Sequence, residues 1–100
     1  AKSMAGNIDF IDELESIIDE RIKSKEKDSY VYGLLSSGLD RVLKKIGEEA
    51  GEVIIAAKND NEQELFNESA DLLFHLLLVL KSKGCSIQDV VNILKERHDR

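Results

Sequence analysis

The segment from residue 72 to residue 80, LLFHLLLVL, constrains the fold more than any other part of the chain. Apart from His75 every position is apolar, so a helix through this segment carries apolar side chains in nearly every direction around its axis. Such a helix must be covered on all sides, and three further helices in a chain of 100 residues could barely surround it. We therefore expect a second copy of the chain to complete the packing as a two-fold homodimer. The alternative is a compact monomeric bundle with this helix at its centre.

Apolar residues recur at helical spacing through most of the remaining chain, and proline is absent. Asn61 followed by Glu64 and Ser86 followed by Asp89 resemble helix N-caps, and Gly84 is suited to end a helix. The segment 29–38 is read as a packed connection with a turn of helix. These signals predict an all-α bundle of four to five helices, with long helices at about residues 8–25, 39–58 and 62–83 and a short helix at about 87–97.

Composition predicts one domain over residues 1–100, with 42% hydrophobic and 34% charged residues. Met4 is the only methionine, so residues 1–6 are expected to be disordered or partly vector-derived. A net charge of −6 and a pI near 4.9 argue against nucleic-acid binding, and no apolar run is long enough to span a membrane. The single cysteine, Cys85, cannot form an internal disulfide, which favours a cytoplasmic setting.

Two acidic clusters flank the predicted turn at residues 59–61, one on each of the helices that the turn joins. Their members, each three or four residues from a neighbour, are Glu48, Glu49 and Glu52 before the turn and Glu68 and Asp71 after it. Residues at this spacing lie next to one another on a helix surface. Each cluster therefore presents a compact group of carboxylates.

The two clusters are expected to lie at the same level along an antiparallel helix pair. Counting from Asp60, Glu52 lies eight residues before it and Glu68 eight residues after it. Glu49 and Asp71 lie eleven residues away on either side. Because the rise per residue is the same on both helices, four carboxylates should face one another across the groove between them.

Unpaired carboxylates in such an array repel one another, and Mg²⁺ resolves this repulsion because it prefers oxygen ligands from carboxylates, phosphates and water. The pattern therefore predicts a magnesium site acting on a phosphate anhydride. For either cluster alone, a solvated acidic helix face is the better interpretation. A carboxylate-bridged di-iron site is disfavoured, because it requires a Glu-x-x-His pattern that the chain lacks.

Five further residues are candidates for contacts with a phosphorylated substrate, and each has a plainer explanation. The lysines and the arginine are of the kind that usually solubilise a surface, and the histidine, one turn after Asp71, could equally be a core residue or orient a carboxylate. The candidates are Lys44, Lys45, Lys58, Arg21 and His75.

These residues resemble a known family. The stretch KKIGEEAGEVIIAAKN at 44–59, followed by ESADLLFH at 68–75, is similar to phosphoribosyl-ATP pyrophosphohydrolases, within the wider all-α nucleotide pyrophosphohydrolases that include MazG-like proteins. The similarity extends over most of the chain, with Ser69 and Phe74 as departures where alanine and tyrosine are expected. The glutamate and aspartate pattern is shared by the superfamily, whereas the flanking residues indicate the histidine pathway.

The resemblance implies an Mg²⁺-dependent homodimer that hydrolyses phosphoribosyl-ATP to phosphoribosyl-AMP and pyrophosphate, the second step of histidine biosynthesis. It implies ATP-like nucleotide binding, Mg²⁺ ligation by Glu49, Glu52, Glu68 and Asp71, and a catalytic role for Glu48 alongside Glu49. The first alternative is a MazG-like house-cleaning pyrophosphohydrolase that acts on nucleoside triphosphates. The second is a helical dimerisation module without enzymatic activity.

Overall fold

Five α-helices make up the part of the chain that the structure describes. The computed structural model describes the backbone of residues 2–25 and 29–99, and the side chains from residue 8 onward within these ranges. No strand occurs in these residues, which confirms the predicted all-α class. The helices are α1 (Lys2–Ser24), α2 (Tyr30–Ser36), α3 (Leu39–Lys58), α4 (Glu62–Ser82) and α5 (Ile87–His98).

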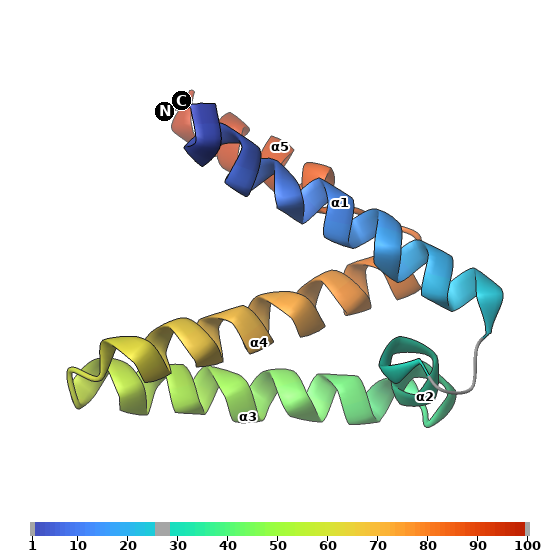
Figure 1. Cartoon of the computed structure of the whole chain (residues 1–100), viewed down its shortest axis with the longest axis horizontal. Helices are drawn as coiled ribbons and strands as arrows, with labels where there is room; N and C mark the ends of the chain where they lie inside the picture. The colour runs from blue at the N-terminus through green and yellow to red at the C-terminus, as the bar shows by residue number, and fades with distance from the viewer. Residues whose placement is uncertain (1, 26–28, 100) are drawn as a thin grey trace.

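α3 and α4 form an antiparallel pair and lie side by side along most of their length (Figure 1). Its turn contains Asp60, whose φ of 54° lies in the left-handed region that aspartate tolerates. Asn61 caps α4, its side-chain oxygen accepting a hydrogen bond from the Glu64 N–H at 3.1 Å. Gly84, with a φ of 75°, follows the C-terminal cap of α4. The bounds predicted for both helices are confirmed to within a residue.

The first two helices differ from the prediction in length. α1 begins at Lys2, six residues before the predicted start, because the residues ahead of Ile8 can adopt a helix without contributing to the apolar periodicity. Ala1 and the side chains of residues 2–7 lie outside the described residues, so the prediction for residues 1–6 stays a prediction. The connection at 29–38 contains the seven-residue helix α2, which is longer than the single turn expected.

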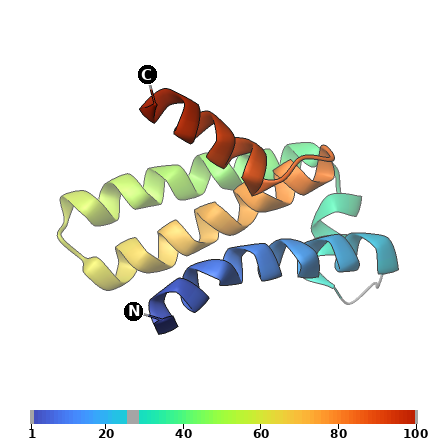
Figure 2. The same cartoon turned by 90° about the horizontal axis from the view of Figure 1, so that it is seen from above.

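The buried core lies at one end of the α3–α4 pair, where α1 and α2 pack against it (Figure 2). Its members come from four helices and are Ile18, Val31, Leu34, Val42, Leu77 and Leu78. Within α4, Leu77 is fully buried, whereas Leu73 and Leu76 remain exposed. A single chain therefore buries one side of this helix near its C-terminal end and leaves apolar surface at Leu73 and Leu76.

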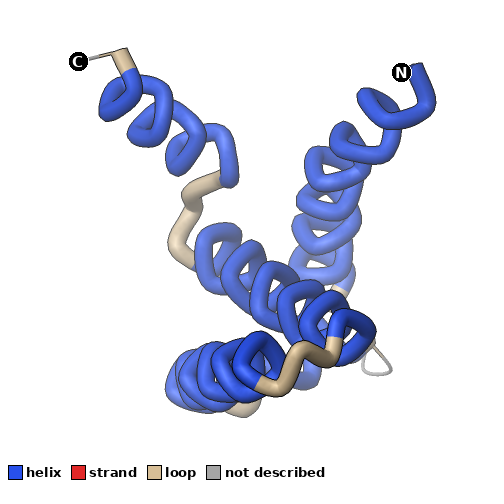
Figure 3. Tube along the Cα trace, turned by 90° about the vertical axis from the view of Figure 1, so that its left-hand side faces the viewer, coloured by secondary structure: helices blue, strands red, loops and turns tan. Residues whose placement is uncertain are grey.

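α1 and α5 diverge from the α3–α4 pair as two arms (Figure 3). Where α5 begins, the buried Glu15 of α1 accepts a hydrogen bond from the Ile87 N–H at 2.7 Å. Ser86 and Asp89 form the predicted capping box at the same helix end. A carboxylate is favoured at a helix N-terminus, because the unpaired N–H groups there carry partial positive charge. Glu15 therefore anchors α5 to α1. None of the described helices combines the length and apolarity needed to cross a membrane.

Replacing Glu15 with alanine should lower stability, because the Ile87 N–H loses a charged acceptor in a partly buried position. The expected loss is about 1.5–3 kcal/mol, and each kcal/mol corresponds to a fall in Tm of about 4–8 °C for a domain of this size. Glu13→Ala, an exposed glutamate two residues earlier on α1, should change Tm little. Equal Tm values for Glu15→Ala and Glu13→Ala in thermal denaturation would contradict the anchoring role.

Candidate metal and substrate site

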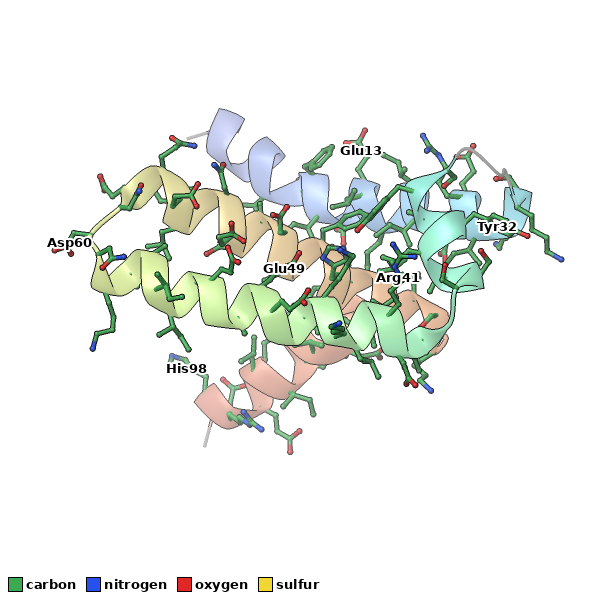
Figure 4. All side chains as sticks on the ribbon, turned by 90° about the horizontal axis from the view of Figure 1, so that it is seen from below. Glu13, Tyr32, Arg41, Glu49, Asp60 and His98 are labelled. Atoms are coloured by element: carbon green, nitrogen blue, oxygen red, sulfur yellow. The ribbon has the colours of Figure 1, made fainter. Side chains whose placement is uncertain are left out.

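The acidic residues of α3 lie on its core-facing side and on the adjoining flank. Glu49 is directed into the region between α3 and α4, with its side chain only 14% exposed (Figure 4). Glu48 and Glu52 are exposed. The α3 cluster therefore combines one largely buried carboxylate with two that solvent reaches.

Glu52 of α3 and Glu68 of α4 face each other, at the level that counting from Asp60 predicts. Partial burial raises the pKa of the Glu68 carboxyl above its ordinary value of 4.5. The negative charges of Glu52, Asp71 and Glu64 raise this pKa further, as does a side-chain hydrogen bond with Glu52. Glu68 is thus close enough to Glu52, Asp71 and Glu64 to be repelled by their carboxylates.

The donor set suits a hard divalent cation, although its geometry is not yet that of a coordination sphere. Among the described residues, no group of three histidine, cysteine, aspartate or glutamate side chains converges closely enough to hold a metal ion. Glu52 and Asp71 are exposed, so solvent reaches both carboxylates. The repulsion that raises the pKa of Glu68 is what a bound Mg²⁺ would relieve.

His75 is 4% exposed and forms hydrogen bonds through both ring nitrogens. Its Nδ1 lies 2.6 Å from Glu49 Oε1 and 2.9 Å from the backbone oxygen of Asp71. Its Nε2 lies 2.8 Å from the hydroxyl of Tyr30. The histidine is therefore a satisfied core residue that also contacts a carboxylate of the candidate site.

Tyr30 and Arg41 also belong to this region, although neither is among the predicted site residues. Partial burial and the negative charge of Glu49 raise the pKa of the Tyr30 phenol above 10.0, with a smaller contribution from Asp71. The nearby positive charge of Arg41 opposes this shift. Both side chains line a shallow hollow next to α2. Tyr30 belongs to a short helix whose position relative to His75 depends on tertiary packing, so spacing along the chain gives no signal for the contact.

The predicted substrate-binding cations are spread over the surface. Lys45 is half-buried one turn before Glu49, and Lys44 is exposed beside it. Lys58 lies nine residues after Glu49, a rotation of about 900°, which directs it to the opposite side of α3. Arg21 is exposed on α1. None of these four described side chains forms an ion pair with the acidic clusters.

The family model described as phosphoribosyl-ATP pyrophosphohydrolase matches residues 11–98. The chain belongs to this family. The match includes both acidic clusters, His75 and Tyr30, and it confirms the predicted family.

Curated relatives of this phosphoribosyl-ATP pyrophosphohydrolase family member fall into two kinds. The phosphoribosyl-ATP pyrophosphatase of Leptospira biflexa is 48% identical over 91% of the chain and 99% of its own length, and that of Pyrobaculum arsenaticum is 44% identical over 87% and 93%. The histidine biosynthesis bifunctional protein HisIE of Thermus thermophilus is 52% identical over 88% of the chain. The chain spans only 41% of that relative's length.

Glu68→Gln should stabilise the metal-free protein at neutral pH. A carboxyl whose pKa is raised on folding makes its full contribution to stability below its unfolded pKa, near 4.5, and this contribution is lost as the pH rises through the folded value. Glutamine removes the repulsion, so the variant should melt at a higher temperature than wild type in EDTA at about pH 7, and the difference should close toward about pH 4.

Thermal denaturation across this pH range tests the expectation, with Glu13→Gln on α1 as the matched control. In wild type, Mg²⁺ at a hundredfold excess over its Kd should add about 2.7 kcal/mol of stability, and Glu68→Gln should gain less. A variant that is less stable than wild type in EDTA at neutral pH would show that Glu68 is not under repulsion.

Proposed function

We propose that this chain hydrolyses the α–β phosphoanhydride of phosphoribosyl-ATP, giving phosphoribosyl-AMP and pyrophosphate in the second step of histidine biosynthesis. Family membership over residues 11–98 supports the substrate, as do the names of relatives that align over nearly their whole length. The observation that carries the chemistry is the close approach of Glu52 and Glu68 across the α3–α4 groove. An acidic groove can bind a polyphosphate only if a cation offsets the negative charge of both.

Four carboxylates are assigned to that cation: Glu49, Glu52, Glu68 and Asp71. Bound Mg²⁺ would supply Lewis acidity, lowering the pKa of a water molecule and offsetting charge on the leaving pyrophosphate. Glu48 lies on the exposed flank beside these groups, where its carboxylate can accept a hydrogen bond from the attacking water and orient it. Glu49 contributes to the same orientation from the buried side of the groove.

The cations nearest the acidic residues are the better candidates for substrate phosphates. Lys45 lies one turn from Glu49 on the same helix, and Arg41 lies one turn beyond Lys45, beside the hollow next to α2. A guanidinium can bind a phosphate through two parallel N–H donors. We assign phosphate contacts to these two residues ahead of Lys58, which is directed away from the groove, and of Arg21 on α1.

The assay that tests the substrate compares pyrophosphate release from phosphoribosyl-ATP, ATP, dCTP and dUTP in the presence of Mg²⁺. The expected result is a kcat/KM for phosphoribosyl-ATP at least about tenfold above the others, a difference of about 1.4 kcal/mol in transition-state stabilisation. Equal turnover of all four nucleotides would favour the house-cleaning alternative instead.

Two charge-removing variants test the metal site independently of the substrate assignment. Glu52→Gln and Asp71→Asn should each weaken Mg²⁺ binding, measured by calorimetry without nucleotide, by at least about 100-fold, because loss of a direct ligand should exceed the loss of a residue that only supports one. Glu13→Gln is the control for removing an exposed charge. Unchanged Mg²⁺ affinity in both variants would refute the metal assignment, whatever the substrate panel gives.

A homodimer is part of the same proposal, supported by the apolar surface that one chain leaves exposed. On α4, Phe66 is 60% exposed and Leu73 follows two turns later, on a row that continues to the fully buried Leu77. Other large apolar side chains exposed on α3, α4 and α5 are Leu43, Ile54, Ile55, Leu76, Ile93 and Leu94. A surface of this kind on a small chain is typical of a protein–protein interface.

Sedimentation equilibrium should therefore give about twice the chain mass of 11.2 kDa. Phe66→Asp should shift the population toward the single-chain mass, because a charge on the exposed apolar row opposes burial. Asn67→Asp adds the same charge one position along and should leave the dimer intact. A wild-type mass of one chain at concentrations where the enzyme is active would contradict the dimer.

A further inference from the structure

The imidazole of His75 connects three helices at the buried side of the acidic groove. It belongs to α4, its Nδ1 contacts Glu49 of α3, and its Nε2 contacts Tyr30 of α2. The ring also packs edge-on against two aromatic neighbours, with ring centroids 5.4 Å from Phe74 and 6.0 Å from Tyr30. Packing and hydrogen bonds therefore determine its orientation together.

The contacts of the ring identify the nitrogen that carries the proton. Nδ1 faces Oε1 of Glu49 and the backbone oxygen of Asp71, and both of these atoms accept hydrogen bonds. Nδ1 must therefore be the donor. When the imidazole is neutral, Nε2 accepts a hydrogen bond from the Tyr30 hydroxyl, and when it is charged, Nε2 donates to the same oxygen. The arrangement holds in both charge states.

The bond to Glu49 restricts how that carboxylate can be used. At 2.6 Å it is a short hydrogen bond to a side chain that is only 14% exposed. It holds Oε1 against the imidazole and leaves Oε2 as the oxygen best placed to meet a ligand in the groove. The Nδ1–H is shared with the carbonyl of Asp71, one turn earlier on α4, so the ring is held to its own helix as well.

We propose that His75 and Tyr30 are positioning residues: the Nδ1–H of His75 orients the Glu49 carboxylate toward the metal, and the Tyr30 hydroxyl holds the ring in that tautomer. This inference rests on the proposed function, because it requires Glu49 to be a metal ligand. It also gives His75 a role other than substrate contact, since the ring is 4% exposed and both nitrogens are bonded within the protein. A metal ligand keeps a productive orientation when another residue hydrogen-bonds to it.

Two substitutions of His75 separate its two hydrogen bonds. In His75→Asn, the amide nitrogen lies the same number of bonds from Cα as Nδ1, so the donor to Glu49 can be kept while the contact to Tyr30 is lost. In His75→Gln, the amide lies one bond further out, near the position of Nε2, so the contact to Tyr30 can be kept while the donor to Glu49 is lost. Both variants replace the ring with an amide and disturb packing similarly.

The first readout is Mg²⁺ affinity, measured by calorimetry without nucleotide, followed by kcat/KM with phosphoribosyl-ATP. His75→Gln should lose about 10- to 100-fold in both, as expected for removal of a residue that supports a metal ligand. His75→Asn should retain more of both, and the free energy of unfolding in EDTA should be similar for the two variants. Equal losses of affinity in the two variants, or none in either, would overturn the proposal.

Tyr30→Phe tests the hydrogen bond between the Tyr30 hydroxyl and Nε2 of His75. It should reduce Mg²⁺ affinity by less than His75→Gln does, because the donor to Glu49 remains while the ring loses its partner at Nε2. Tyr32→Phe, two residues along α2, is the matched control and should bind Mg²⁺ as wild type does. Equal Mg²⁺ affinities in Tyr30→Phe and Tyr32→Phe would remove Tyr30 from the proposal.

Nitrogen NMR of histidine-labelled protein gives a readout independent of activity. In the metal-free protein, His75 should carry its proton on Nδ1, and His98→Asn identifies its signals because these are the two histidines of the chain. A neutral ring with its proton on Nε2 would overturn the inference. Failure of wild type to bind Mg²⁺ would instead refute the metal site itself, so the two failures are distinguishable.

Discussion

The register of α3 against α4 is the constraint on which the rest of the site depends. It is set by the short turn around Asp60, where the Asn61 N–H donates to the Ala56 oxygen at 3.1 Å and the Asn61 side chain caps the following helix. A shift of one residue would rotate a helix by about 100° and move it by about 1.5 Å along its axis. Glu52 would then no longer face Glu68, and His75 would lose Glu49. A turn of three residues thus determines which carboxylates meet about 12 to 16.5 Å away along the helices, at about 1.5 Å per residue.

That register brings like charges together, and the fold tolerates this because the groove and the core lie at different places along the same helix pair. The buried cluster around Leu77 and Val42 holds the end of the hairpin next to α1 and α2. Glu68 and Glu52 lie nearer the turn, where little of the surrounding apolar surface is buried. Repulsion at the site therefore lowers stability without disrupting the core. Sites built for a charged ligand commonly reduce the stability of the unliganded protein in this way.

The long helices were predictable because their signals are local. Leu39–Lys58 and Glu62–Ser82 each combine a helical apolar period with terminal caps, and the level of the acidic clusters followed from counting along two helices of known rise. The start of α1 was missed because Lys2–Asn7 carry no apolar period. These errors concern ends and short elements, which local patterns specify least.

The contacts of His75 were not predictable from spacing. The chain shows that this residue follows Asp71 by one turn, which left a core role and a site role equally open. The structure shows that the ring is buried and hydrogen-bonded to Glu49, and the proposed positioning role depends on that bond. Tyr30 is 45 residues away in sequence and reaches the ring only because α2 packs over the hairpin. Contacts of this kind depend on tertiary packing and carry no sequence period.

The proposed homodimer accounts for the apolar side chains of α4 that its own chain leaves on the surface. Its own chain buries Leu77 and Leu78 toward the C-terminal end, whereas the N-terminal half and the middle of the helix carry Phe66, Leu73 and Leu76 on the surface. The carboxylates of Glu68 and Asp71 lie within that exposed half, on the flank of the helix that faces α3. A second copy packed on the apolar row would therefore hold the backbone that carries both residues. Such packing would restrict the motion of the part of the site that a single chain buries least.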